Sequence, residues 1–323
     1  MNENAVKKET KKESFMQGVL TLMLSQVAIK LLGLVYTLYL TNREGFGDRG
    51  NAIYSSGYQI YALLLTISSI GVPNAISKLV SERYAVGDNK GAHRVFKIAI
   101  ATFAVIGFAG SLLLFLGAYS IANYWIGIPE AEMTLVALSP AIFFVAISSV
   151  MRGYFNGRKS IKTTARAQTL EQIFKTFLTI FIVEIIAIST NTSTELMAAG
   201  ANVATTLAIF LSFSYLGLYY RTKRKEIGQE IKETKNYKSE RVSSIIKKIL
   251  YVSIPMTLSS IMSSLNKIID TTTVVRILKT YMTEAEATVK LRYFKWKGRY
   301  FNKFTSFNKY SICYCFSSSN SSS

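Results

Sequence analysis

The residues of this chain best suited to chemistry are charged side chains that interrupt long apolar stretches. Lys30 lies inside the first stretch, with Gln26 and Gly33 about one turn away on the same face of a helix. A charge in a hydrocarbon core costs about 2.5–3.5 kcal/mol on insertion scales, so it requires a partner, a water-filled cavity or a function. We expect Lys30 to face a cavity. The alternative is a lysine that pairs structurally or extends its side chain to the interface.

The fifth apolar stretch carries a polar stripe. Its members recur at three- and four-residue spacing, which makes one side of a helix polar for three turns: Gln168, Glu171, Gln172, Lys175 and Thr179. Glu171 and Lys175 stand four residues apart and can form an ion pair. Two interpretations are open here. Either Lys175 is a cavity cation, or the helix starts late and both charges lie at the cytoplasmic interface.

A second polar stripe lies near the C-terminal end. Its members stand opposite apolar residues, as is typical of a helix that lines an aqueous cavity: Ser260, Ser263, Ser264, Lys267, Asp270 and Thr271. We take Lys267 and Asp270 as candidate cavity residues, with mutual neutralisation across three residues as the alternative. Pro255 in this helix and Pro73 in the second stretch each remove a backbone hydrogen bond, so both should kink their helices.

Membrane-spanning helices must position these side chains. Of the 323 residues, 50% are hydrophobic. About 20 residues, rising about 1.5 Å each, cross a hydrocarbon core of about 30 Å. Six runs are long enough: 15–40, 52–80, 95–118, 132–151, 167–188 and 196–219. A seventh run, 244–278, is apolar but richer in polar side chains. The sequence therefore predicts an all-α, multi-pass membrane protein.

The net charge of +19 is distributed in alternation along the chain. Lys and Arg cluster before the first run and after the second, fourth and sixth runs, whereas 119–131 and 189–195 contain neither. The positive-inside rule then predicts a cytoplasmic N-terminus, with odd-numbered helices running outward. This distribution argues against a nucleic-acid partner. The basic stretch from Arg221 to Lys248 is expected to meet anionic membrane lipids.

The predicted organisation follows from these runs. It comprises a cytoplasmic tail, a six-helix transmembrane lobe, a basic cytoplasmic linker, a seventh transmembrane helix and an aberrant or disordered tail: 1–14, 15–219, 220–243, 244–278 and 291–323. The last segment lacks Ala, Val, Asp and Glu and ends in a serine-rich run. A low-complexity tail is one account. A change of reading frame from about Leu291, which would truncate a longer protein, is the account we favour.

Several functions lack the residues that they need. The N-terminal run has no cleavage site of a signal peptide. The cysteines are Cys313 and Cys315, so the core has no disulfide or cysteine metal site. His93 is expected to be a solvated loop residue. No GxxxxGK[ST] pattern marks an ATP-driven pump, and the short outer connections hold no catalytic cluster. We therefore expect no enzyme, metal or cofactor.

Four stretches carry a resemblance to a known family: 28–34, 71–82, 151–157 and 268–271. With them, residues 15–290 resemble the first half of the polysaccharide transporter family, which includes lipid II flippases and the stage V sporulation protein B group. It belongs to the multidrug, oligosaccharidyl-lipid and polysaccharide exporter superfamily. The resemblance implies a MATE-like transporter in which two six-helix lobes form a V, of which this chain supplies one lobe and a seventh helix.

The resemblance also implies a function. Members of this family move an undecaprenyl-pyrophosphate-linked sugar or peptidoglycan precursor outward through the cell membrane by alternating access. Cationic side chains hold the pyrophosphate. Lys30 and Lys78 stand where the family keeps basic residues, and Lys175, Lys267 and Asp270 join them as candidate cavity residues. A coupling ion can accompany such transport. The alternatives are a cation-coupled antiporter of organic cations on the same fold, and a non-transporting remnant.

Overall fold

The computed structural model of the chain describes residues 15–69, 71–189, 193–234, 239–258 and 261–262. Within these ranges the long elements are all helices. Their bounds are α1 Phe15–Asn42, α2 Gly47–Ser69, α3 Gly71–Ala85, α4 Asn89–Ser120, α5 Glu132–Gly157, α6 Ile161–Ser189 and α7 Thr194–Lys232. Residues 242–258 are also helical. A π-helical turn, Ile121–Ile126, and a 3₁₀ turn, Pro129–Ala131, join α4 to α5.

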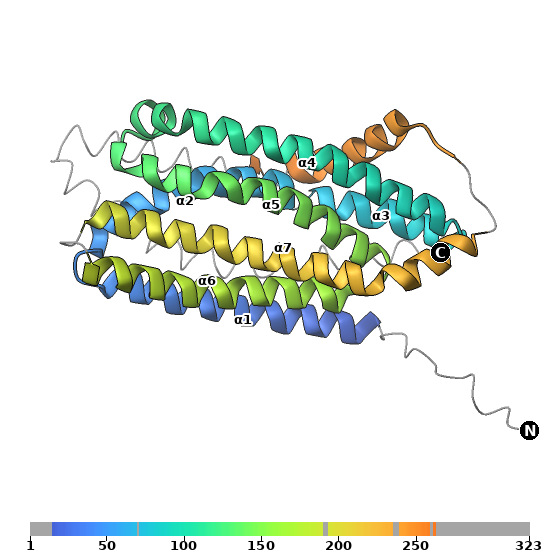
Figure 1. The fold of residues 1–323 in the computed structure, drawn as a ribbon, viewed down its shortest axis with the longest axis horizontal. Helices are drawn as coiled ribbons and strands as arrows, with labels where there is room; N and C mark the ends of the chain where they lie inside the picture. Colours follow the sequence, from blue (N-terminus) through green and yellow to red (C-terminus); the bar gives the residue numbers. More distant parts are fainter. Residues whose placement is uncertain (1–14, 70, 190–192, 235–238, 259–260, 263–323) are drawn as a thin grey trace, which may run out of the picture. The chain divides into compact units, whose positions relative to one another are not determined.

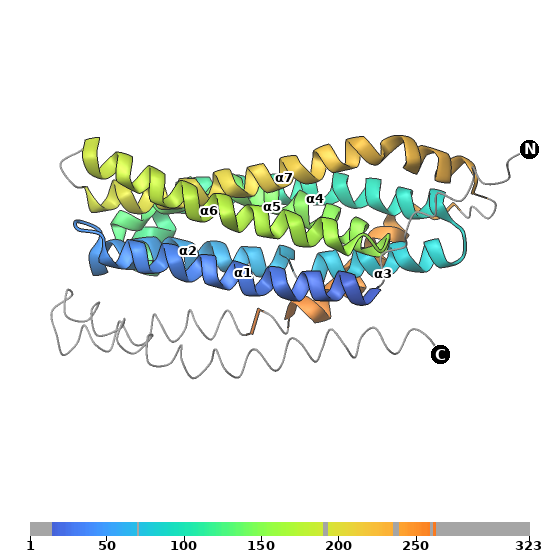
Figure 2. The ribbon, with the colours of Figure 1, turned by 90° about the horizontal axis from the view of Figure 1, so that it is seen from below.

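Six spans are long and apolar enough to cross a membrane, with α2 and α3 counted as one span. This confirms the six predicted runs. The helices lie side by side in one bundle (Figures 1 and 2). α5 contacts α2, α3, α4 and α7, while α6 packs between α1 and α7. In the most apolar window of each span, 61% of the α5 residues are buried but only 6% of the α1 residues. α5 is therefore central, and α1 leaves most of its surface uncovered.

The second span comprises α2 and α3, with residue 70 between them outside the described residues, and the predicted kink at Pro73 stays a prediction. α2 ends at Ser69 and α3 begins at Gly71. Proline has no N–H group, so the carbonyl of the residue four positions earlier, Ser69, receives no helical hydrogen bond from it. The two parts of the span then pack on different neighbours, because α3 contacts α4 and α5 whereas α2 contacts α5 and α7.

Two of the four stretches that carry the family resemblance pack directly against each other. A Cβ atom at Gly153 of α5 would lie 2.7 Å from the carbonyl oxygen of Pro73. One turn later, a Cβ atom at Gly157 would lie 2.8 Å from the carbonyl oxygen of Ser77. Small residues four apart let two helix backbones approach closely in a membrane. Because Gly153 and Gly157 have no side chain, the backbone of 151–157 can lie directly against the backbone of 71–82.

The predicted linker 220–243 begins as helix. α7 continues through Lys232, well beyond the predicted end at 219. Its extension packs apolar side chains, since Ile227 and Ile231 join a core cluster with Ile245 and Ile249 of the following helical segment. Residues 242–258 are the described part of the predicted seventh helix; its remainder lies outside the described residues. The Glu240 carboxylate before it accepts hydrogen bonds from Lys248, which lower its pKa, and it also pairs with Arg83 at 2.9 Å.

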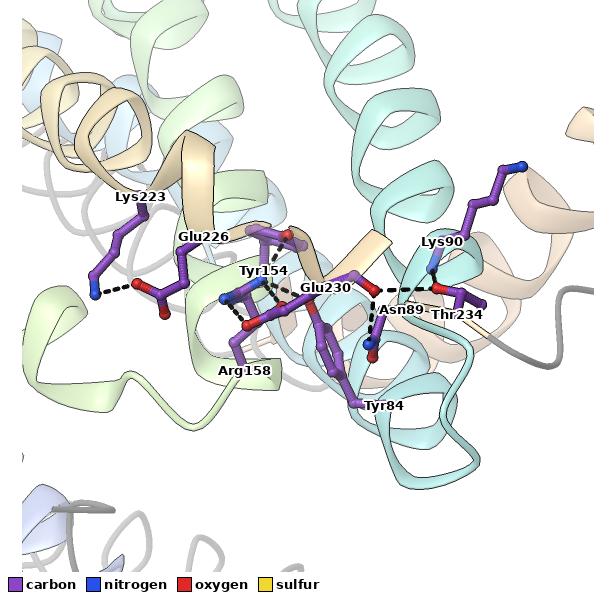
Figure 3. A network of polar contacts seen from close by, with 9 residues as sticks. All are labelled: Tyr84, Asn89, Lys90, Tyr154, Arg158, Lys223, Glu226, Glu230 and Thr234. Atoms are coloured by element: carbon purple, nitrogen blue, oxygen red, sulfur yellow. Dashed lines mark hydrogen bonds and ion pairs between the residues drawn. The ribbon is translucent and has the colours of Figure 1, made fainter. Parts of the chain in front are cut away.

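A polar network ties the extension of α7 to the bundle (Figure 3). Arg158, just after α5, donates to both carboxylate oxygens of Glu230 at 2.9 and 3.1 Å. The same guanidinium donates to Tyr84 of α3 at 2.5 Å. Asn89 of α4 donates to the backbone carbonyl of Glu230 at 3.2 Å. A two-point arginine–carboxylate pair is among the stronger polar contacts in proteins, so the network fixes this end of the lobe.

Replacing Glu230 by glutamine should destabilise the lobe by about 2 kcal/mol, because a partly buried guanidinium loses its charged partner. The measurement is the thermal unfolding of the purified protein in detergent. Glu226→Gln, one turn earlier on α7, is the matched control. Its pair with Lys223 is exposed (Figure 3), so its loss should cost at most about 0.5 kcal/mol. Equal effects of the two substitutions would contradict the structural role of the network.

Candidate functional site

The structure places the three described candidate cations in different surroundings. Lys30 lies exposed on α1. Lys78 lies on α3 with a side chain 61% exposed, at 4.0 Å from Glu82 in an i,i+4 pair. Lys175 of α6 is buried, with only 6% of its surface exposed. Lys267 and Asp270 lie outside the described residues. One of the sequence-predicted cations is thus enclosed in the lobe, and two lie on its surface.

Part of the polar stripe of α6 lies against α1. Gln26 donates to Gln168 at 3.2 Å, and Thr176 donates to the carbonyl of Leu32 at 3.4 Å. A Cβ atom at Gly33 would lie 3.7 Å from the amide nitrogen of Gln172. α6 begins at Ile161, well before these residues. The expectation that this helix starts late is therefore wrong, while the position of its charges relative to the membrane interface stays a prediction.

The predicted Glu171–Lys175 pair is replaced by a pair with α5. Arg152 Nη2 lies 2.6 Å from Glu171 Oε2, and the two side chains are 11% and 27% exposed. Arg152 belongs to the last turns of α5 rather than to the basic connection in which the sequence placed it. The planar guanidinium presents a fork of donors to a carboxylate, whereas lysine offers a single ammonium. Lys175 is left to other partners.

The partners of Lys175 are tyrosine rings. Its ammonium nitrogen lies 4.4 Å from the ring centre of Tyr58 and 5.1 Å from that of Tyr36. Tyr54 stacks on Tyr58 with ring centres 5.8 Å apart, and Tyr61 lies 5.6 Å from Tyr58. We call these four residues the tyrosine cluster. Its α2 members recur at three- and four-residue spacing, a sequence signal that a search for charged side chains misses because it ignores the aromatic groups around them.

The tyrosine cluster compensates only part of the cost of burying Lys175. Removing an ammonium from water costs several kcal/mol even after relaxation. A desolvated contact between a cation and an aromatic ring returns about 2 kcal/mol. Among the described ion pairs, none places a carboxylate beside Lys175. The lobe therefore encloses an excess positive charge.

Two further buried polar side chains lie on α6 and α7. Thr179 of α6 and Asn202 of α7 are both 0% exposed. The Thr179 hydroxyl and both side-chain polar atoms of Asn202 have no hydrogen-bond partner in the structure. Buried polar groups are almost always hydrogen-bonded in folded proteins. Thr179 and Asn202 are therefore exceptions to this rule.

The single histidine differs from its expectation. His93 lies in the first turns of α4 and is half-buried, because α4 begins at Asn89 rather than near 95. Its ring stacks on Tyr220 with centres 6.4 Å apart and lies 5.8 Å from Phe96. The expectation of a solvated loop histidine is therefore wrong. Within the described ranges, no group of three His, Cys, Asp or Glu side chains is placed so that it could hold a metal ion.

Comparisons with known proteins agree with this architecture. A family model described as "Polysaccharide biosynthesis protein" matches residues 15–296. The chain is 27% identical over 264 residues to stage V sporulation protein B of Bacillus subtilis, covering 79% of this chain and 48% of that protein. It is also 27% identical over 218 residues to the lipid II flippase MurJ of the same organism, covering 65% and 40%. The chain thus spans about half the length of these curated relatives.

Solved structures share the fold. A MOP superfamily transporter from Pyrococcus furiosus, described as having a binding pocket of reversed polarity, matches with a TM-score of 0.65 and 15% identity over 86% of this chain and 58% of that one. A MATE transporter in its straight conformation matches with a TM-score of 0.66 and 15% identity over 86% and 58%. The described helices therefore have the fold of one lobe of such a transporter.

Proposed function

This chain belongs to the polysaccharide biosynthesis protein family, and from that premise we propose that it functions as an outward flippase of the MOP superfamily. Its six apolar spans make it a multi-pass protein of the cell membrane. The proposed substrate is an oligosaccharide or peptidoglycan precursor linked to undecaprenyl pyrophosphate. Its relatives support this class, since one is named a lipid II flippase. Movement by alternating access needs no covalent chemistry.

The observation that carries the proposal is the cationic character of the lobe. Lys30 lies on α1, whose surface is mostly uncovered within the lobe. Lys78 is exposed on α3, and Lys175 adds a buried positive charge behind α1 and α2. Cations in a cleft of low dielectric suit a diphosphate. We propose that Lys30 and Lys78 contact the diphosphate and that Lys175 contributes to the positive potential. Lys267 and Asp270 would contribute from the seventh helix.

The ion pairs made by two described carboxylates favour a lipid-linked diphosphate over an organic cation as the substrate. Glu171 is paired with Arg152, and Glu184 is paired with Arg43 at 3.0 Å. A site for an organic cation needs negative charge that is not already neutralised. The alternative antiporter function therefore has less support from the lobe.

A groove at the predicted cytoplasmic end suits the proposed lipid partner. It lies between α4 and α7, has a volume of about 500 Å³ and is lined by Lys97, Arg221 and Arg224 beside His93 and Tyr220. Basic side chains at the membrane surface attract anionic headgroups, with about 1 kcal/mol for each residue. We propose that the basic stretch from Arg221 to Lys248 binds anionic lipids here, and that the N-terminus is cytoplasmic.

The role of Lys30 can be tested by measuring the binding of undecaprenyl pyrophosphate to the purified protein in nanodiscs. Lys30→Ala should weaken binding at least about tenfold, because one charge-assisted contact contributes about 1.5–3 kcal/mol. Lys30→Arg keeps the charge and should retain most of the affinity. Lys90→Gln is the control, since its side chain is exposed at the predicted cytoplasmic end, at the start of α4. If Lys30→Ala binds undecaprenyl pyrophosphate as tightly as the natural protein does, Lys30 has a structural role and does not contact the diphosphate.

A further inference from the structure

The groove between α4 and α7 is formed by one face of each helix. His93 and Lys97 of α4 stand four residues apart, which places them on one side of that helix. On α7, Gly217, Arg221 and Arg224 recur at four- and three-residue spacing and share a face in the same way. A Cβ atom at Gly217 would meet nothing within 4 Å. At this position the groove is therefore open, and no neighbouring side chain fills it.

The three cations that line the groove are not neutralised within the described part of the chain. There, Lys97, Arg221 and Arg224 form neither an ion pair nor a hydrogen bond with another side chain. Arg158 at the same end of the lobe, by contrast, is paired with Glu230 at 2.9 Å. The groove therefore presents an excess of positive charge that this part of the protein does not compensate.

The groove lies where both helices leave the apolar part of the membrane. On α4, two turns beyond Lys97, the apolar side chain of Val105 is 70% exposed. On α7, Leu218 is 59% exposed and stands three residues before Arg221. On each helix, exposed apolar side chains thus give way to cations at the predicted cytoplasmic end. Cations at this level meet the headgroups of the cytoplasmic leaflet.

The excess charge fits a phosphomonoester better than a phosphodiester. A phosphomonoester carries about −1.5 to −2 charges at pH 7 and three acceptor oxygens, whereas a phosphodiester carries a single negative charge. We propose that the groove binds a lipid whose headgroup is a phosphomonoester, held by Lys97, Arg221 and Arg224 through charge-assisted hydrogen bonds. The proposal rests on the anionic lipid proposed above as the partner of this groove, and it adds the class of the headgroup.

The shape of the groove agrees with this ligand. Its volume of about 500 Å³ lies within the range of about 300–1,000 Å³ that is usual for sites of small ligands. Gly217 stands one turn nearer to the bilayer than Arg221. The acyl chains of a bound lipid therefore leave the groove past a residue that has no side chain.

The test is a calorimetric titration of the purified full chain in detergent with two short-chain lipids, dioctanoyl phosphatidic acid and dioctanoyl phosphatidylglycerol. Phosphatidic acid, the monoester, should bind at least about tenfold more tightly, as expected for one additional hydrogen bond between charged groups. Arg224→Gln should weaken its binding at least about tenfold for the same reason. Gly217→Leu should weaken it as well, because the new side chain occupies the groove while every charge is kept.

Lys247→Gln is the matched control. Lys247 is exposed and belongs to the same basic stretch, but it does not line the groove, so this variant should keep the affinity and the preference of the natural protein. If Lys247→Gln and Arg224→Gln weaken binding equally, the lipid meets a diffuse basic surface and the proposed site is wrong. Inorganic phosphate that binds as tightly as phosphatidic acid would also contradict a lipid site.

The two lipids also separate this inference from the proposal on which it rests. Equal affinity for both lipids, lost in Gly217→Leu, would overturn the preference for a phosphomonoester and leave the anionic lipid as the partner of the groove. No binding of either lipid would overturn both. Neither lipid carries a sugar or a diphosphate, so the result is independent of the proposed transport.

Discussion

Replacing Gly153 by leucine should prevent the lobe from folding. A Cβ atom at this position would lie 2.7 Å from the Pro73 carbonyl oxygen and 2.9 Å from the Ile76 Cβ atom. These atoms belong to the backbone of α3 or stand next to it, so no side-chain rotation can make room. Overpacking usually costs about 1–3 kcal/mol, and separating two helices that meet at their backbones should cost at least the upper value. The measurement is the yield and melting temperature of the protein extracted in detergent.

The matched controls are alanine substitutions at two helical glycines. Gly153→Ala should lower the melting temperature, because even one methyl group overlaps α3. Gly228→Ala on α7 should raise or preserve it, since nothing lies within 4 Å of its Cβ position and alanine favours a helix by up to about 1 kcal/mol. If both alanine variants shift the melting temperature in the same direction, the close approach of α3 and α5 is not what stabilises the lobe.

The close contact between α3 and α5 joins two of the stretches that carried the family resemblance. Residues 71–82 and 151–157 are far apart in sequence, yet their backbones lie in contact. The two glycines of α5, Gly153 and Gly157, let the backbone of α3 come close to that helix. In these stretches the glycines serve close packing, whereas Lys78 is an exposed charge.

The helices could be predicted because hydrophobic length and charge are local properties of the sequence. Each of the six spans follows from a run long enough to cross a membrane. The fold of the lobe came from a family resemblance rather than from periodicity. Helical spacing also identified Lys175 and its polar stripe correctly as one face of a helix.

The partners of these side chains could not be predicted, because they depend on contacts between distant helices. Spacing allowed Glu171 to pair with Lys175, but Arg152 on α5 has the better geometry for a carboxylate. The tyrosine cluster then encloses Lys175 from α1 and α2. His93 has no local signal of its stacking on Tyr220, since that ring comes from α7. Charge alone does not indicate which neighbour a side chain meets.

The most direct test of the proposed function is survival of a bacterium whose own lipid II flippase is depleted. We predict that the full chain restores growth and lowers the amount of lipid-linked precursor held on the cytoplasmic side of the membrane. Lys30→Ala, at an equal amount in the membrane, should lose most of this activity because it removes a contact to the diphosphate. The measured quantity is the precursor accessible from outside relative to the total.

Growth and outward precursor at the level of the undepleted strain are the expected result. No growth and no outward precursor, with the chain present in the membrane at normal amounts and folded by its melting temperature, would contradict the assignment of this lobe to a flippase of lipid-linked sugars.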